Sequence, residues 1–165
     1  MKKNIFLIIV SLTLVSCGVY SFTGGSTGDA KTIQIDFFPN NATLVEPTVS
    51  QKFTIALQDL FLRQTNLSLV SNGGDLHFEG EITTYKIIPI SATAEQTAAQ
   101  NRLTVGVRVR FYNKLIPEDD FDRSFSFFSD YGANQPLTGS VLEDALNEIF
   151  ERVNQDIFNA SVAKW

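Results

Sequence analysis

The sequence contains few of the side chains from which most enzyme and metal sites are built. It has one cysteine (Cys17) and one histidine (His77) among 165 residues. A lone cysteine excludes an intramolecular disulfide, and no cluster of zinc ligands at a suitable spacing is evident. A histidine-assisted Ser or Cys nucleophile, a glycine-rich phosphate loop and a dinucleotide-binding fingerprint are missing as well. We therefore predict no metal, no cofactor and no enzymatic activity.

Positive charge and long apolar runs are also scarce. Lys and Arg number 13 against 18 Asp and Glu, and the net charge of −5 argues against nucleic acid as a partner. No apolar run reaches the ~20 residues that a membrane-spanning helix needs. Phe, in contrast, is abundant at 14 residues, and aromatic side chains favour half-buried strands.

The N-terminal segment has the form of a bacterial lipoprotein signal peptide. Two lysines follow the first methionine, an apolar stretch runs from Ile5 to Val15, and the small Ser16 precedes Cys17. This pattern predicts that residues 1–16 are removed and that Cys17 becomes the lipid-carrying N-terminus. The alternative is an ordinary secretory signal followed by an incidental cysteine.

The remaining chain has the length of one domain. Removal of the first 16 of 165 residues leaves 149, enough to bury a substantial core. Residues 17–30 are rich in Gly, Ser and Thr, which predicts a lipidated N-terminus followed by a tether. Residues 31–165 are expected to form a single α/β domain.

Hydrophobic periodicity predicts the order β-α-β-β-β-β-α. The helical pattern covers residues 48–64 and a closing stripe from Leu142 to Ile157, and each helix begins at a possible Ser/Thr-x-x-Glu/Gln capping box, at Thr48 and Ser140. Apolar and polar residues alternate in the predicted strands, which are 32–38, 67–70, 76–82, 102–112 and 121–127. Gly80 falls in the apolar register, so we expect a bulge or a close overlying side chain there.

These elements predict an α+β fold, a two-layer sandwich with two helices packed on one face of a mixed four- to five-stranded sheet. A right-handed crossover through the first helix would make the first two strands parallel. The later strands are expected to form antiparallel hairpins. The second face of the sheet would stay polar and accessible.

The polar side of strand 102–112 carries the best candidate site, a stripe formed by Arg102, Arg108 and Arg110. One interpretation is cross-strand pairing with the carboxylates of neighbouring strands, namely Glu79, Glu81, Asp120 and Asp122. Arginine also binds phosphate in a bidentate manner, so the stripe is a candidate contact for an acidic glycolipid or a partner protein.

Two further features lie on the predicted strands. The apolar run Ile87–Ile90 at the end of a strand either contacts a partner or folds back onto the core. His77 alternates with Glu79 and Glu81 on a polar strand face, and a lone histidine in that position is expected to be solvated.

The mature chain resembles the LptE family of outer-membrane lipoproteins from the lipopolysaccharide assembly machinery, in the form found in Bacteroidota. The stretches that carry the resemblance are CGVYSFTG (17–24), FPNN (38–41), NRLTV (101–105) and DIFNASVAKW (156–165). The resemblance implies a two-layer α/β domain at the outer membrane that plugs a large β-barrel translocon. It also implies help with assembly of the barrel and with delivery of lipopolysaccharide, and among site residues it supports Cys17 alone.

We therefore expect a non-enzymatic outer-membrane lipoprotein, anchored by lipid on Cys17 and facing the periplasm and the barrel lumen. Its expected partners are the barrel protein and lipopolysaccharide. A lipid-anchored periplasmic binding module for a small ligand or glycan is the first alternative, and a deep apolar pocket would favour it. A hydrolase that uses Glu79 and Glu81, which share one strand face, is the second.

Overall fold

The structure is a computed structural model, and it describes residues 27–44, 46–90 and 99–163. The predicted signal peptide, Cys17, most of the predicted tether and most of the loop expected at 91–100 lie outside the described residues. The elements follow in the order β1 (Thr32–Ile35), α2 (Val49–Gln64), β2 (Ser68–Leu69), β3 (Leu76–Ile90), β4 (Gln100–Asn113), the 3-10 turn η2 (Pro117–Asp119), β5 (Phe121–Gly132) and α3 (Gly139–Ser161).

The five strands form one mixed sheet in the order β2-β1-β3-β4-β5. β1 pairs parallel with β2, as the crossover through α2 predicts. β4 pairs antiparallel with both β3 and β5, which confirms the expected hairpin arrangement of the three long strands. β1 lies between β2 and β3 and also pairs parallel with β3.

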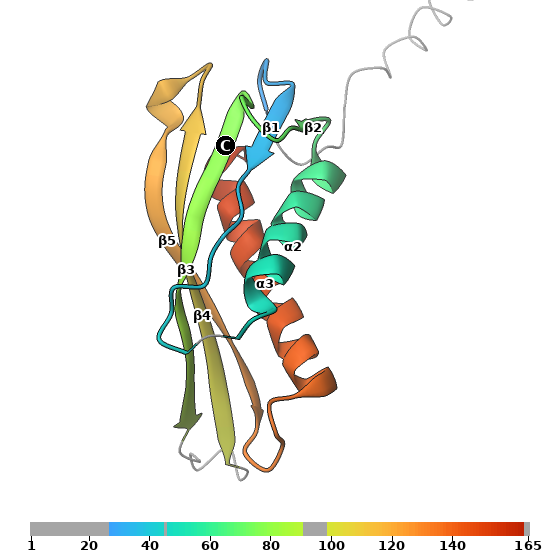
Figure 1. The fold of residues 1–165 in the computed structure, drawn as a ribbon, viewed down its shortest axis with the longest axis vertical. Coiled ribbons are helices and arrows are strands. Elements are labelled where there is room, and N and C mark those ends of the chain that lie inside the picture. Colours follow the sequence, from blue (N-terminus) through green and yellow to red (C-terminus); the bar gives the residue numbers. More distant parts are fainter. Residues whose placement is uncertain (1–26, 45, 91–98, 164–165) are drawn as a thin grey trace, which may run out of the picture.

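Both helices lie on the same face of the sheet, so the molecule has two layers (Figure 1). Every second residue of β4 points at the helices, and these side chains are at most 1% exposed, namely Leu103, Val105, Val107, Val109 and Phe111. Phenylalanines fill the space between the layers. Phe53 and Phe61 come from α2, Phe158 comes from α3, and each contacts another aromatic ring at 4.9–5.4 Å between centroids.

The helix starts differ from the predicted capping boxes. Thr48 is the residue before α2, but its hydroxyl makes no capping hydrogen bond and donates instead to Glu46 Oε1 at 3.3 Å. α3 begins one residue before Ser140, with Thr138 as its N-cap, so the second predicted box is also wrong. The amphipathic stripes place both helices correctly, because packing of the apolar face contributes more to helix stability than the cap does.

A close overlying side chain at Gly80 is confirmed. A Cβ added at Gly80 would lie 2.1 Å from the carbonyl oxygen of Arg108 and 2.6 Å from Cε1 of Phe38. Phe38 belongs to the segment after β1, which runs beside β3 and exchanges backbone hydrogen bonds with Ile82. The register shift in the β3–β4 ladder lies further along, between Ile82 and Thr84. The missing side chain therefore lets the Phe38 ring lie against the sheet.

Replacing Gly80 with alanine is expected to lower the free energy of unfolding by about 1–3 kcal/mol, as overpacking usually does. The cost should lie near the upper end, because one clashing atom belongs to the backbone of β4. Gly132→Ala is the matched control, since its nearest neighbours are atoms of the Gln135 side chain at 3.3 Å or more. Urea unfolding of both variants measures the difference, and equal midpoints would contradict the proposed role of Gly80.

Candidate functional site

The candidate site is the face of the sheet that the helices leave uncovered. Arg102, Arg108 and Arg110 alternate with the buried side chains of β4 and therefore project from this open face, as predicted. Their side chains are 33%, 48% and 37% exposed.

Each of the three arginines pairs with a carboxylate of an adjacent strand. Arg102 binds Asp130 of β5 through two hydrogen bonds of 2.7 and 2.8 Å. Arg108 binds Asp122 of β5 in the same manner, at 2.8 and 2.6 Å. Arg110 donates from Nε to Oε1 of Glu79 in β3 at 2.6 Å. The open face therefore presents rows of neutralised pairs.

The partners expected from the sequence are correct in part. Glu79 and Asp122 bind arginines of the stripe, whereas Glu81 accepts a hydrogen bond from Asn41 at 2.6 Å. Asp120 accepts one from the backbone N–H of Asn113 at 2.7 Å. The sequence does not predict Asp130 as a partner, because the predicted strand ends at residue 127 whereas β5 runs to Gly132.

Aromatic rings on the open face lie beside the charged pairs. The Arg102 guanidinium lies over the ring of Phe128, with Cζ 3.5 Å from the ring centroid. The Tyr112 hydroxyl donates to Glu79 at 3.1 Å. Phe128 and Tyr112 are each 39% exposed, so the face offers flat apolar contact area between its charges.

The pairing lowers the pKa of two acidic partners, Glu79 and Asp122. The hydrogen bond from Arg110 is the main reason that the pKa of Glu79 lies below its usual value. The hydrogen bond from Arg108 likewise lowers the pKa of Asp122. A general acid needs a raised pKa to hold its proton at neutral pH. The Glu79 carboxyl has the opposite shift, which argues against Glu79 as the general acid of the hydrolase alternative.

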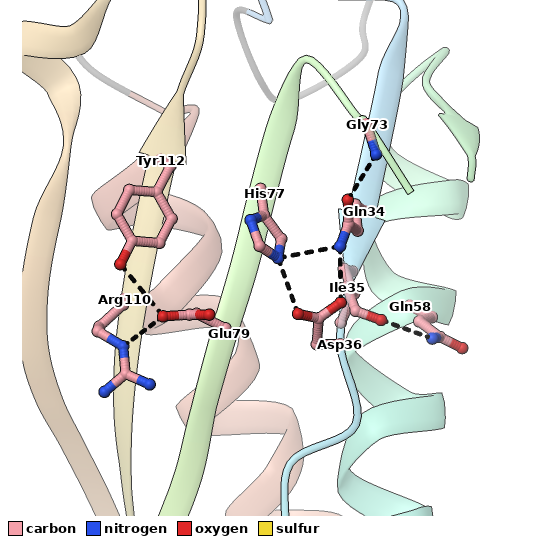
Figure 2. A network of polar contacts seen from close by, with 9 residues as sticks. All are labelled: Gln34, Ile35, Asp36, Gln58, Gly73, His77, Glu79, Arg110 and Tyr112. Atoms are coloured by element: carbon pink, nitrogen blue, oxygen red, sulfur yellow. Dashed lines mark hydrogen bonds and ion pairs between the residues drawn. The ribbon is translucent and has the colours of Figure 1, made fainter. Parts of the chain in front are cut away.

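His77 lies in a polar network at the β1–β3 boundary (Figure 2). Its Nε2 is 2.8 Å from Oδ2 of Asp36 and 3.1 Å from Nε2 of Gln34, and its side chain is 24% exposed. The expectation of a freely solvated histidine is therefore wrong. Partial burial opposes ionisation of Asp36, but hydrogen bonds from Gln34 and His77 outweigh it and lower the pKa of Asp36.

The apolar run Ile87–Ile90 remains on the surface. Ile87 pairs with Leu103 and is 39% exposed, while Ile88 pairs with Arg102 and is 38% exposed. Neighbouring residues of a strand point to opposite faces, so Ile87 lies on the helix-facing side and Ile88 on the open face. The end of β3 therefore offers apolar contacts on both faces of the sheet.

The chain matches a family model described as LptE, lipopolysaccharide-assembly, over residues 30–161. The chain belongs to the LptE lipopolysaccharide-assembly family. LptE membership gives the protein a role in lipopolysaccharide assembly and places it among lipoproteins associated with the outer membrane. Within the part of the chain that the structure describes, no helix is long and apolar enough to span a bilayer.

Solved structures similar to this LptE chain include three bacterial lipoproteins. A minor lipoprotein from Acinetobacter baumannii has 9% identity and a TM-score of 0.49, with 82% of this chain and 98% of that chain covered. Rare lipoprotein B from Shewanella oneidensis has 14% identity and a TM-score of 0.43, with 77% and 89% covered. Uncharacterized lipoprotein B from Nitrosomonas europaea has 8% identity and a TM-score of 0.48, with 79% and 83% covered. The comparison with curated proteins gives no match.

Removing the arginine partner should raise the pKa of Asp122. In Arg108→Gln we expect that pKa to move toward the ordinary value of about 3.9. A carboxylate with a lowered pKa stabilises the fold above its unfolded pKa, and this contribution disappears as pH falls through the folded value. Wild type and variant should therefore differ in unfolding midpoint at neutral pH and converge in acid.

Carboxyl carbon NMR titration and urea unfolding at several pH values measure the two effects. Arg123→Gln is the control, because it removes the same charge next to Asp122 without breaking the Arg108 pair. An Asp122 pKa that is unchanged in Arg108→Gln would contradict the assignment of its cause.

Proposed function

We propose that this LptE protein is a non-catalytic, lipid-anchored subunit of the lipopolysaccharide export machinery. In this proposal it faces the periplasm, inserts into the lumen of a large outer-membrane β-barrel translocon and assists assembly of that barrel. It thereby supports insertion of lipopolysaccharide at the outer membrane. The match of residues 30–161 to the LptE family carries the proposal.

The surface of the domain is compatible with a position inside a barrel. The lumen of such barrels is polar, so a domain that fills one needs a polar outer surface. The open sheet face meets this need through its arginine–carboxylate pairs, and exposed charged residues of the helices add Lys52–Glu143 and Arg152–Asp156 pairs on the other side.

The binding-module alternative receives little support from the core. That alternative needs an apolar pocket between sheet and helices. Large side chains fill this space, and the phenylalanines among them are less than 2% exposed, namely Phe38, Phe53, Phe61, Phe78, Phe111 and Phe158. The hollow of about 590 Å³ on the outer side of α2 and α3 has charged side chains in its lining, including Lys52, Arg63 and Glu151.

The arginine stripe is the proposed contact with the glycolipid or the barrel. Two oxygens of a phosphate group accept the same pair of parallel hydrogen bonds that the carboxylates of Asp122 and Asp130 accept in the free domain. Acidic groups of a ligand would replace those carboxylates, and the ring of Phe128 would keep the Arg102 guanidinium oriented meanwhile.

Cys17 is the proposed anchor. We expect the native protein to fractionate with membranes and its N-terminal fragment to carry acyl chains, and Cys17→Ala to leave the membrane. The reason is that each buried methylene contributes about 0.8 kcal/mol, so several acyl chains give lasting attachment. Mass spectrometry of the native N-terminus and cell fractionation test this. An unmodified N-terminus or a free periplasmic wild-type protein would contradict the anchor.

Photo-crosslinking from two surfaces tests the plug. A photoreactive residue is placed at Tyr112 or Phe128 on the open face, and at Ile55 or Leu62 on α2, positions that are 39–46% exposed. A domain enclosed by a barrel wall should crosslink to the same large outer-membrane barrel protein from both surfaces. Samples without irradiation are the control.

Crosslinks from one surface alone would exclude the lumenal position while keeping the barrel as partner. Recovery of no barrel protein from any of the four positions would contradict the proposal as a whole.

Replacing Arg102, Arg108 and Arg110 together with glutamine should weaken binding to purified lipopolysaccharide by at least about tenfold, because three charge-assisted contacts are lost. The unfolding midpoint should fall only slightly and the protein should stay folded, since each exposed ion pair contributes little to stability. Equilibrium binding at fixed salt and urea unfolding give the two values.

The matched control removes three positive charges from the helical side, through Lys52→Gln, Arg63→Gln and Arg152→Gln. If both triple variants lose affinity equally, general charge attraction and not the stripe accounts for binding. That result would reject the stripe as the contact.

A further inference from the structure

Three potential metal ligands meet at the boundary between β1 and β3. We propose that Asp36, His77 and Glu79 form a binding site for a divalent transition-metal ion of the zinc type. The site uses no residue of the arginine stripe as a ligand, and the inference is independent of the proposed function.

Strand pairing brings the three side chains together. β1 and β3 run parallel with Gln34 beside His77, so Asp36, two residues on, lies near Glu79 on the open face. One ligand atom from each residue lies within 4.8 Å of the other two. Nitrogen and oxygen ligands lie about 2.0–2.2 Å from Zn²⁺ and therefore about 3.3–3.6 Å from one another in a tetrahedral site. Small side-chain rotations are enough to reach that spacing.

The hydrogen bonds around His77 fix the orientation of the side chains in this cluster. The backbone N–H of Gly73 donates to Gln34 Oε1 at 2.8 Å, which fixes the orientation of that amide. The amide nitrogen then faces both Asp36 Oδ1 at 2.8 Å and His77 Nε2 at 3.1 Å. Figure 2 shows the Gln34 amide and the Asp36 carboxylate both approaching Nε2 of His77.

One nitrogen cannot satisfy both of its neighbours. To accept from the Gln34 amide, His77 Nε2 must carry a lone pair, but to bind the Asp36 carboxylate at 2.8 Å it must carry a proton. If Nε2 carries a proton, Nε2 and the Gln34 amide are two donors that face each other. If Nε2 carries a lone pair, Nε2 and the Asp36 carboxylate are two acceptors that face each other. A metal ion removes the conflict between Nε2 and Asp36, because it takes a lone pair from each, and the Gln34 amide then bonds Asp36 Oδ1 alone.

The surrounding residues would then orient the ligands. The Gln34 amide keeps its hydrogen bond to Asp36 Oδ1, the kind of outer contact that holds a ligating carboxylate in place. Arg110 and Tyr112 both donate to Oε1 of Glu79, which leaves Oε2 as the ligand atom.

Charge and access also suit a divalent cation. Two carboxylates and a neutral imidazole contribute two negative charges to the site. The side chains of Asp36, His77 and Glu79 are 40%, 24% and 33% exposed, so an ion reaches them from solvent and water completes its coordination. The positive charge of Arg110 nearby reduces the affinity, so we expect an exchangeable ion.

Zinc titration of the purified full chain in detergent tests the proposal. His77 is the only histidine, so its ring signals in a proton–carbon NMR spectrum are assigned without ambiguity, provided that no polyhistidine tag is attached. We expect one equivalent of Zn²⁺ to shift those signals and calorimetry to give one site. Thiolate binding at Cys17 would not move them.

Variants separate a metal site from a structural network. His77→Gln, Asp36→Asn and Glu79→Gln should each weaken Zn²⁺ binding by at least about tenfold, the range seen when groups that hold a metal are removed. Glu81→Gln is the control, because it neutralises a carboxylate of the same strand face that binds Asn41 instead. Circular dichroism checks that every variant is folded.

Unshifted His77 signals at excess Zn²⁺ in the wild-type chain would overturn the proposal without reliance on any variant. Equal affinity in wild type and His77→Gln would overturn it as well.

Discussion

Burial of aromatic side chains between the sheet and the helices is the constraint from which the other features follow. Phe53, Phe61 and Phe158 from the helices and Phe78 and Phe111 from the sheet lie in this layer, and all of them are at most 1% exposed. A strand has a side-chain period of two, so fixing one face of β3 and β4 against this layer fixes the other face as well. The positions of the charged residues on the open face are therefore set by the core.

The open face carries many charged side chains, but paired carboxylates neutralise the arginines of the stripe. Arg102, Arg108 and Arg110 each bind a carboxylate of a neighbouring strand, so these three positive charges are paired in the free domain. Exposed pairs of this kind exchange partners at small cost, since they contribute little to stability. This property suits a surface that must be soluble alone and also bind an acidic or polar partner.

Insertion of β1 between β2 and β3 has a different consequence. It places residues 32–38 beside residues 76–82, which brings Phe38 onto the Gly80 backbone on the buried side and Asp36 onto His77 on the open side. The position of β1 in the sheet therefore creates both a packing contact in the core and a polar cluster on the surface. The family role in lipopolysaccharide assembly does not itself account for the cluster.

The sequence alone determined the two amphipathic helices, the alternation of β4, the two-layer α+β class and the location of the arginine stripe, because each depends on periodicity within one segment. It also indicated the special position of Gly80, since a glycine in an apolar register leaves space that another side chain must fill. Only the tertiary structure decided the strand order, the Arg102–Asp130 pair, which of the predicted carboxylates Arg110 binds, and the meeting of Asp36 with His77. Those contacts join residues 28, 31 and 41 positions apart, and their geometry depends on which strands become neighbours when the core closes.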